Sequence, residues 1–153
     1  MSSLDLQATL WLQSLKGSGP ALDLFLEQWL VLASEIGNPS SVLATLVPML
    51  FALRPRLAPT VMVAYISADI LNGMLKFPLM GDRPYWLSEE VRQYPHTCES
   101  GYGMPSGHVM TTTTAWLTLL LLLQQRGERA PARAVALFCA VLLPSVMLSR
   151  VYT

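Results

Sequence analysis

Charged residues are scarce in this sequence. Asp, Glu, Lys and Arg make up 13% of its 153 residues, whereas a soluble domain usually carries about 25%. Hydrophobic residues make up 52%, and the mean hydropathy is +0.42. A surface with so little charge is poorly solvated, so the composition favours a membrane protein over the alternative, a soluble helical protein with a large core.

Several other signals are absent. Ten acidic residues balance ten basic ones, so no overall field attracts nucleic acid, and no nucleic-acid partner is expected. The two cysteines, Cys98 in a polar loop and Cys139 in an apolar run, are not expected to pair. No basic segment precedes an apolar core at the N-terminus, so a first membrane helix has to direct insertion. The triplet Asn38-Pro39-Ser40 has proline in its middle position, which excludes glycosylation there.

The sequence does contain a series of apolar stretches. Over residues 21–36, apolar residues recur at helical spacing and acidic residues take other positions, which is typical of an amphipathic helix in the membrane interface. Four further apolar stretches follow at about 39–53, 59–80, 109–125 and 132–149. We therefore predict an all-α fold: a polytopic transmembrane helix bundle with about four membrane helices plus the N-terminal amphipathic helix, in a single domain over residues 1–153.

The basic residues predict how this bundle is oriented. The loops after the first and third membrane helices hold the basic excess, namely Arg54, Arg56, Arg126, Arg129 and Arg133. The positive-inside rule places these two loops on the cytoplasmic side. The long loop over residues 81–108 and the end of the last helix then face the other side of the membrane.

Candidate functional residues gather on that non-cytoplasmic side. Lys76, Arg83 and Arg150 lie near helix ends there, and ionisable side chains at membrane depth either serve a site or extend toward the interface. Pro105-Ser106-Gly107-His108 directly precedes the third membrane helix. A helix start with a serine hydroxyl and an unhindered glycine amide suits a phosphate oxygen. His108 is either a proton donor near neutral pH or a helix cap.

Together these motifs resemble those of a known family. Lys76-x6-Arg83-Pro84, then Pro105-Ser106-Gly107-His108, then Ser149-Arg150 occur in this order, as in the type-2 phosphatidic acid phosphatase and vanadium haloperoxidase superfamily. Gly81-Asp82-Arg83-Pro84-Tyr85-Trp86 and Cys98-Glu99-Ser100-Gly101 are similar to its glucose-6-phosphatase branch. The resemblance extends from roughly residue 22 to residue 153, the N-terminal portion of that family's longer chain.

The resemblance implies a role for each of these residues. The phosphate-binding residues would be Lys76, Arg83, Ser106, Gly107 and Arg150. His108 would be the catalytic general acid, which protonates the departing sugar hydroxyl. No metal ion and no other cofactor is implied. The roles agree with the chemistry, because phosphoryl transfer depends above all on charge neutralisation and alignment.

The resemblance also implies a nucleophile. In that family a second histidine, five residues after the pair that corresponds to Ser149-Arg150, attacks phosphorus and forms a phosphohistidine, which water then hydrolyses. Here Val151, Tyr152 and Thr153 follow the pair, and the other histidine, His96, matches no catalytic motif. We therefore expect a chain truncated at its C-terminus (a partial sequence, a splice form or a degraded gene copy) that has negligible turnover on its own.

The implied activity is the hydrolysis of glucose 6-phosphate to glucose and phosphate, a step of glucose metabolism and gluconeogenesis. The implied setting is the endoplasmic reticulum membrane, with a multi-pass chain whose site faces the lumen. The implied partners are the phosphorylated sugar, the lipid bilayer and a glucose 6-phosphate transporter. Two alternatives remain: a lipid phosphate or polyprenyl diphosphate phosphatase of the same superfamily, and a non-catalytic truncated membrane protein that associates with the full-length enzyme.

Polar residues near these motifs have secondary interpretations. Asp69 and Asn72 precede Lys76 at helical spacing, so the three residues are expected on one helix face, with a charge partner for the lysine among them. Tyr85 and Trp86 suit the membrane–water boundary, and a sugar pocket is the alternative.

Overall fold

A computed structural model of the chain describes residue 7 and residues 20–81 and 102–152. The described elements are α2 (Pro20–Ile36), α3 (Pro39–Ser41), the π-helix η1 (Val42–Leu46), α4 (Val47–Leu53), α5 (Ala58–Leu79), α7 (Gly107–Gln125) and α8 (Arg129–Tyr152). Within these residues the chain is helical and contains no strand, apart from an isolated bridge between Gly81 and Met104. The prediction of an all-α membrane helix bundle is confirmed.

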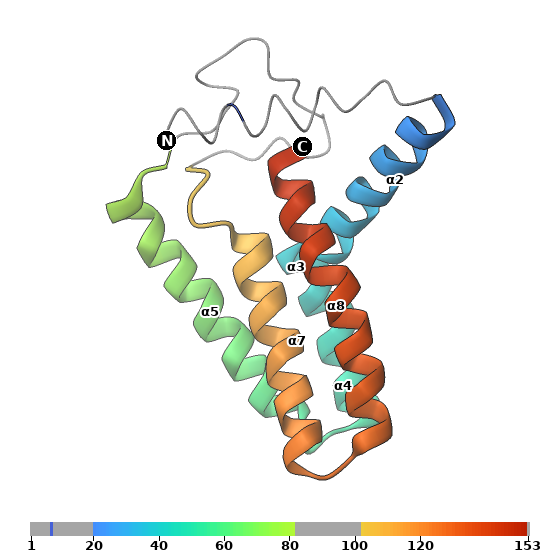
Figure 1. The fold of residues 1–153 in the computed structure, drawn as a ribbon. Coiled ribbons are helices and arrows are strands. Elements are labelled where there is room, and N and C mark those ends of the chain that lie inside the picture. The colour runs from blue at the N-terminus through green and yellow to red at the C-terminus, as the bar shows by residue number, and fades with distance from the viewer. Residues whose placement is uncertain (1–6, 8–19, 82–101, 153) are drawn as a thin grey trace.

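Helix α7 is at the centre of the bundle. It packs against α5 on one side and α8 on the other, and the three helices run side by side (Figure 1). Helix α2 packs against α8, and the chain then bends by 57° before it continues through α3, η1 and α4. At the bend, the Asn38 side chain caps α3 by accepting a hydrogen bond from the Ser40 amide (3.0 Å), and Pro39 takes the first helical position, where no amide is needed.

The stretch expected as one helix at 39–53 is divided into three parts. Its middle part, Val42–Leu46, is π-helical, and Pro48 lies in the first turn of α4 that follows. Proline cannot donate the hydrogen bond that a continuous α-helix requires at that position. The π-helical turn before Pro48 changes the hydrogen-bond spacing of the backbone, as such turns do at irregular points in other helices.

The outer surface of the bundle is apolar. Among its exposed side chains are Val63 (60% exposed) and Phe77 (72%) on α5 and Leu137 (72%) on α8. In the described part of the chain, α5 and α8 are long and apolar enough to cross a membrane, and the bent pair of residues 23–36 and 39–53 makes a third crossing if it forms one span. Helix α7 packs between α5 and α8. Its hydropathy is lower than theirs because it contains the four threonines Thr111–Thr114.

The interior is polar at one end of the bundle and apolar at the other. Buried polar side chains are Ser34, Asn72, His108, Thr111, Thr112, Ser145 and Ser149. Some of them connect segments of different helices. For example, Thr112 Oγ1 donates to Gly37 O (2.8 Å), and Trp29 Nε1 donates to Ser145 Oγ (3.0 Å). The opposite half has an apolar core that includes Leu57, Val61 and Leu119. Polar contacts between helices are favourable in a membrane protein, where lipid offers no alternative partner.

The two basic loops lie at the same end of the bundle, as expected for an arrangement of four successive membrane helices. Arg54 Nη1 lies 2.6 Å from Glu128 Oε2, which joins the turn between α4 and α5 to the turn between α7 and α8. This end is the lower one in Figure 1. The C-terminal end of α5, the start of α7 and the end of α8 lie at the upper end.

Close packing at the bend gives a first prediction. A Cβ atom on Gly37 would lie 2.8 and 2.9 Å from the two methyl groups of Val146, which is fully buried. We expect Gly37→Ala to destabilise the protein by about 1–3 kcal/mol, as overpacking does in other cores. Gly73→Ala is the matched control, because a Cβ there meets nothing within 4 Å and alanine favours the helix by about 0.5–1 kcal/mol. Thermal unfolding in detergent measures both, and equal midpoints would contradict the packing at the bend.

Candidate active site

Lys76 lies in the last turn of α5 and is half-buried. The helix ends just after it, because Met80 adopts a left-handed conformation (φ 38°, ψ 41°) and donates its amide hydrogen bond to Lys76 O (3.1 Å). This is a common way for a helix to end. It fixes the lysine at the upper end of the bundle, close to where the chain leaves α5.

The chain returns to this same point before α7 begins. Gly103 N donates to Gly81 O (2.7 Å), and Gly81 forms an isolated antiparallel bridge with Met104. A Cβ on Gly81 would lie 2.6 Å from the Cβ of Met104, so this approach requires glycine. The segment that follows Gly81 contains Arg83, the second predicted phosphate ligand, which lies outside the described residues, as do Tyr85, Trp86 and His96.

The start of α7 has the geometry of an anion-binding helix terminus. Ser106 is the N-cap (φ −71°, ψ 116°), and its Oγ accepts from Val109 N at 3.5 Å, the outer limit of a hydrogen bond. The hydroxyl acts as acceptor in this bond, so its own hydrogen can still be donated to a phosphate oxygen. The amides of the first helical turn add partial positive charge at the same place. His108, in this first turn, is buried (7% exposed).

Asn72 connects α5 to this helix start. Its side chain is buried (4% exposed), and Nδ2 donates to Pro105 O (3.2 Å). A Cβ added to Gly107 would lie 3.3 Å from Asn72 Oδ1, so glycine allows the helix start to approach the amide closely. Asn72 lies one turn before Lys76, so the contact places the Lys76 end of α5 beside Ser106–His108. The sequence indicated that Asn72 and Lys76 share a helix face, but it did not indicate that Asn72 binds the backbone at Pro105, just before α7.

Asp69 does not fulfil the expectation that it pairs with Lys76. Its side chain is exposed, whereas Asn72 is buried, so the two do not share one environment. Among residues 20–81 and 102–152, no ion pair joins Asp69 to Lys76. Asp69 lies two helical turns, about 10 Å along the axis, from Lys76, which is too far for a direct ion pair between the two side chains.

The third motif lies at the end of α8. Ser149 is fully buried, and its Oγ donates to Val146 O (2.7 Å). The buried serine fixes the rotation of α8, which places Arg150 in the last turn, half-buried, with Nη1 3.5 Å from Ser34 Oγ on α2. Lys76, Ser106, Gly107, His108 and Arg150 therefore all belong to helix ends at one end of the bundle (Figure 1).

The contact of Asn72 gives a second prediction. We expect Asn72→Leu, which keeps the volume but removes the donor to Pro105 O, to weaken the binding of a phosphate ester roughly tenfold. The reason is that the loop carrying Ser106 and Gly107 loses its link to α5. Equilibrium dialysis with radiolabelled glucose 6-phosphate measures the change. Asp69→Leu, on the exposed face of the same helix, is the control, and an equal loss in both variants would contradict the role of Asn72.

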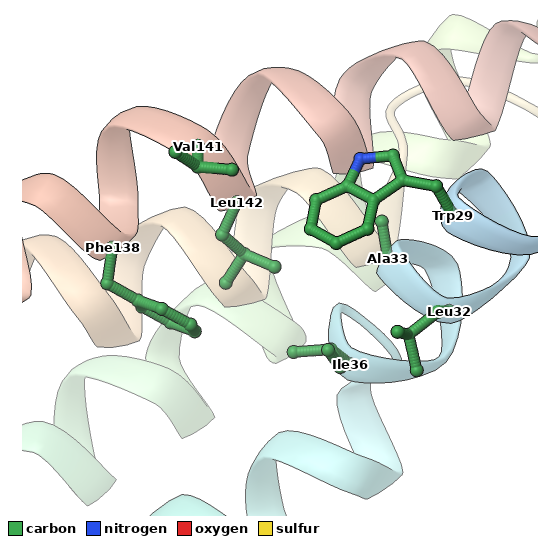
Figure 2. Close-up of a pocket in the computed structure, with 7 residues that line it drawn as sticks. All are labelled: Trp29, Leu32, Ala33, Ile36, Phe138, Val141 and Leu142. Carbon is green, nitrogen blue, oxygen red and sulfur yellow. The ribbon is translucent and has the colours of Figure 1, made fainter. Parts of the chain in front are cut away.

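A separate cavity lies between α2 and α8, away from these residues. It has a volume of about 100 Å³ and is lined by Trp29, Leu32, Ala33, Ile36, Phe138, Val141 and Leu142 (Figure 2). Its lining side chains are apolar apart from the Trp29 indole nitrogen, which already donates to Ser145. Such a cavity offers nothing to bind a phosphate group, so it is not part of the candidate active site.

Comparisons with known proteins agree with these motifs. Residues 57–153 match the PAP2 superfamily. Glucose-6-phosphatase 3 of Bos taurus is 33% identical over 133 residues, which cover 76% of this chain and 38% of that protein. Glucose-6-phosphatase catalytic subunit 1 of Canis lupus familiaris is 31% identical over 147 residues, which cover 82% of this chain and 41% of that protein. No solved structure matches the chain.

The chain spans about two fifths of the length of these curated relatives. The matched region contains the candidate residues that the structure brings to one end of the bundle. By its motifs, its helical membrane architecture and these matches, the chain belongs to the glucose-6-phosphatase family of the PAP2 superfamily.

Proposed function

We propose that this chain forms the substrate-binding part of a membrane phosphatase that hydrolyses glucose 6-phosphate to glucose and phosphate. The observation that carries the proposal is the convergence of three separate motifs. The end of α5, the start of α7 and the end of α8 contribute a lysine, a serine–glycine–histidine helix start and an arginine at one end of the bundle. These groups come from stretches that lie far apart in the sequence, and this shared location supports the proposal.

In the proposed function, the cations neutralise the phosphoryl group. Lys76 and Arg150 supply two positive charges, and Arg83, outside the described residues, supplies the third. An arginine donates paired hydrogen bonds to two phosphate oxygens, and a lysine acts as a point charge. The Ser106 hydroxyl and the Gly107 amide bind the remaining oxygen. Such prearranged donors stabilise the charge that spreads over these oxygens in the transition state.

The proposed role of His108 is to move a proton. Its imidazole lies in the first turn of α7, directly after the serine and glycine proposed to bind phosphate. A group in that position can protonate the sugar oxygen as its bond to phosphorus breaks. The family resemblance implies that the attacking histidine of the proposed two-step reaction stands five residues after the pair that corresponds to Ser149-Arg150, a position that residues 1–153 do not include. We therefore propose that a polypeptide of these 153 residues binds the substrate but has negligible turnover.

The setting of the reaction is part of the proposal. The basic loops that carry Arg54 and Arg126 lie at the end of the bundle opposite the candidate active site, so the positive-inside rule orients that site away from the cytoplasm. From the family resemblance we propose the endoplasmic reticulum membrane as the location, with the site facing the lumen. Association with a glucose 6-phosphate transporter is proposed on the same basis.

The proposal is tested by binding and turnover measured on one preparation. The 153-residue polypeptide in detergent is expected to bind radiolabelled glucose 6-phosphate saturably, with displacement by inorganic phosphate. Phosphate release is expected to stay at the level of His108→Ala. Release well above that level would refute the expected inactivity. If dioctanoyl phosphatidic acid binds and the sugar phosphate does not compete, the function is that of a lipid phosphatase instead.

A further inference from the structure

A cluster of three arginines lies at the end of the bundle opposite the candidate active site. Arg54, Arg56 and Arg126 line one cavity of about 200 Å³, together with Leu53, Pro55 and Leu57. A water molecule takes about 30 Å³ in the liquid, so the cavity accommodates a small polyatomic group. The proposed phosphatase reaction makes no use of these residues.

Two defined turns hold the arginines in place. After α4, the amide of Leu57 donates to Arg54 O (2.8 Å), a tight turn that keeps Arg54 and Arg56 close together. After α7, Gly127 adopts a positive φ of 71°, and its amide donates to Gln124 O (2.9 Å). This turn follows the end of α7 at Gln125 and has Arg126 as the C-cap of the helix. The ion pair between Arg54 and Glu128 then fixes one turn against the other.

The charge of the cluster is largely uncompensated. Glu128 pairs with Arg54, whereas in the described part of the chain no carboxylate pairs with Arg56 or Arg126. Guanidinium groups are weakly hydrated and form paired hydrogen bonds with phosphate oxygens. A cavity with two spare guanidinium groups therefore recognises an anion such as a phosphate.

The surroundings of the cavity distinguish a lipid headgroup from a free anion. The cavity lies where α5 begins and α7 ends, and α5 is long and apolar enough to cross a membrane, which puts the arginines at the level of the lipid headgroups. Leu53, which is 68% exposed, and Pro55 provide apolar walls beside the cations. Headgroup phosphate with adjoining acyl chains matches this combination of charge and apolar surface.

We propose that Arg56 and Arg126, with Arg54, form a binding site for the phosphate of an anionic phospholipid. The site is independent of the proposed catalytic reaction, because it lies at the other end of the bundle. A lipid bound there bridges the turn after α4 and the turn after α7. It stabilises the packing of these two turns in the membrane.

The test compares two double variants that remove the same charge. Arg56→Gln/Arg126→Gln is expected to weaken the binding of dioctanoyl phosphatidylglycerol in detergent about tenfold, since each basic group near a membrane surface contributes measurably to anionic lipid binding. Arg129→Gln/Arg133→Gln removes two arginines from the start of α8, outside the cavity, and is expected to change the affinity less than about twofold. Isothermal titration calorimetry measures both. Phosphatidylglycerol is a phosphodiester, so the proposed monoesterase reaction does not consume it.

Other outcomes would overturn the proposal. Equal losses in the two double variants would show general surface attraction, and equal affinity for dioctanoyl phosphatidylcholine would show that the anionic headgroup is not recognised. Inorganic phosphate binding as tightly as the lipid would make the ligand a free anion. If Arg56→Gln/Arg126→Gln does not fold, Arg56→Lys/Arg126→Lys keeps the charge but loses the paired donors. That variant is expected to bind the lipid several-fold more weakly than Arg129→Lys/Arg133→Lys.

Discussion

Replacing Arg150 with alanine is expected to weaken the binding of glucose 6-phosphate roughly tenfold to a hundredfold, the loss that usually follows removal of a hydrogen bond between charged groups. Arg150 lies in the last turn of α8, and the buried Ser149 beside it fixes the rotation of that helix. Its Nη1 lies 3.5 Å from Ser34 Oγ on α2. The half-buried guanidinium therefore lies at the same end of the bundle as the end of α5 and the start of α7.

Two further variants separate the charge of Arg150 from its geometry. Arg150→Lys keeps the positive charge but not the paired donors, so its affinity is expected between those of the wild type and Arg150→Ala. Arg133→Ala removes an exposed arginine from the same helix near its opposite end and is expected to leave the affinity unchanged. Equilibrium dialysis with the 153-residue polypeptide measures all three. The proposed site would be wrong if Arg133→Ala lost as much affinity as Arg150→Ala.

The sequence predicted the helical fold well because apolar periodicity determines which stretches are helical. It predicted helix ends less well, since those depend on capping and not on hydropathy. Helix α7 begins at Gly107 instead of residue 109, because Ser106 caps it. Helix α8 begins at Arg129 instead of residue 132, with Pro131 in its first turn. Proline has no backbone N–H, but an N–H in the first turn of a helix would have no partner within the helix, so proline is tolerated there.

The site was predictable to the extent that its motifs are local. Lys76, Ser106-Gly107-His108 and Arg150 stood out because each joins an unusual charge or a helix start to a membrane helix end. The role of Asn72 was not predictable, because it depends on a contact with Pro105 O across 33 positions of the chain. No local pattern distinguishes an asparagine that fixes a loop from one that faces a neighbouring helix.

His108→Ala is expected to lower the hydrolysis of glucose 6-phosphate by about 10²- to 10⁴-fold, the usual contribution of a general acid. The measurement requires the nucleophile, so residues 1–153 are continued with the part of Bos taurus glucose-6-phosphatase 3 that follows the matched region. His108 lies in the first turn of α7, two residues after Ser106, and its side chain is buried. Comparison of kcat for this hybrid with and without the substitution gives the loss.

The leaving group distinguishes proton donation by His108 from a structural role. A sugar alkoxide is a poor leaving group that needs a proton as the bond to phosphorus breaks, whereas p-nitrophenolate leaves without one. His108→Ala is therefore expected to reduce the hydrolysis of p-nitrophenyl phosphate far less than that of glucose 6-phosphate. Arg150→Ala in the same hybrid is expected to reduce both to a similar extent, because both substrates present the same phosphoryl oxygens. If His108→Ala lowered both rates equally, the histidine would be holding the helix start in place, and the general acid would have to be another group.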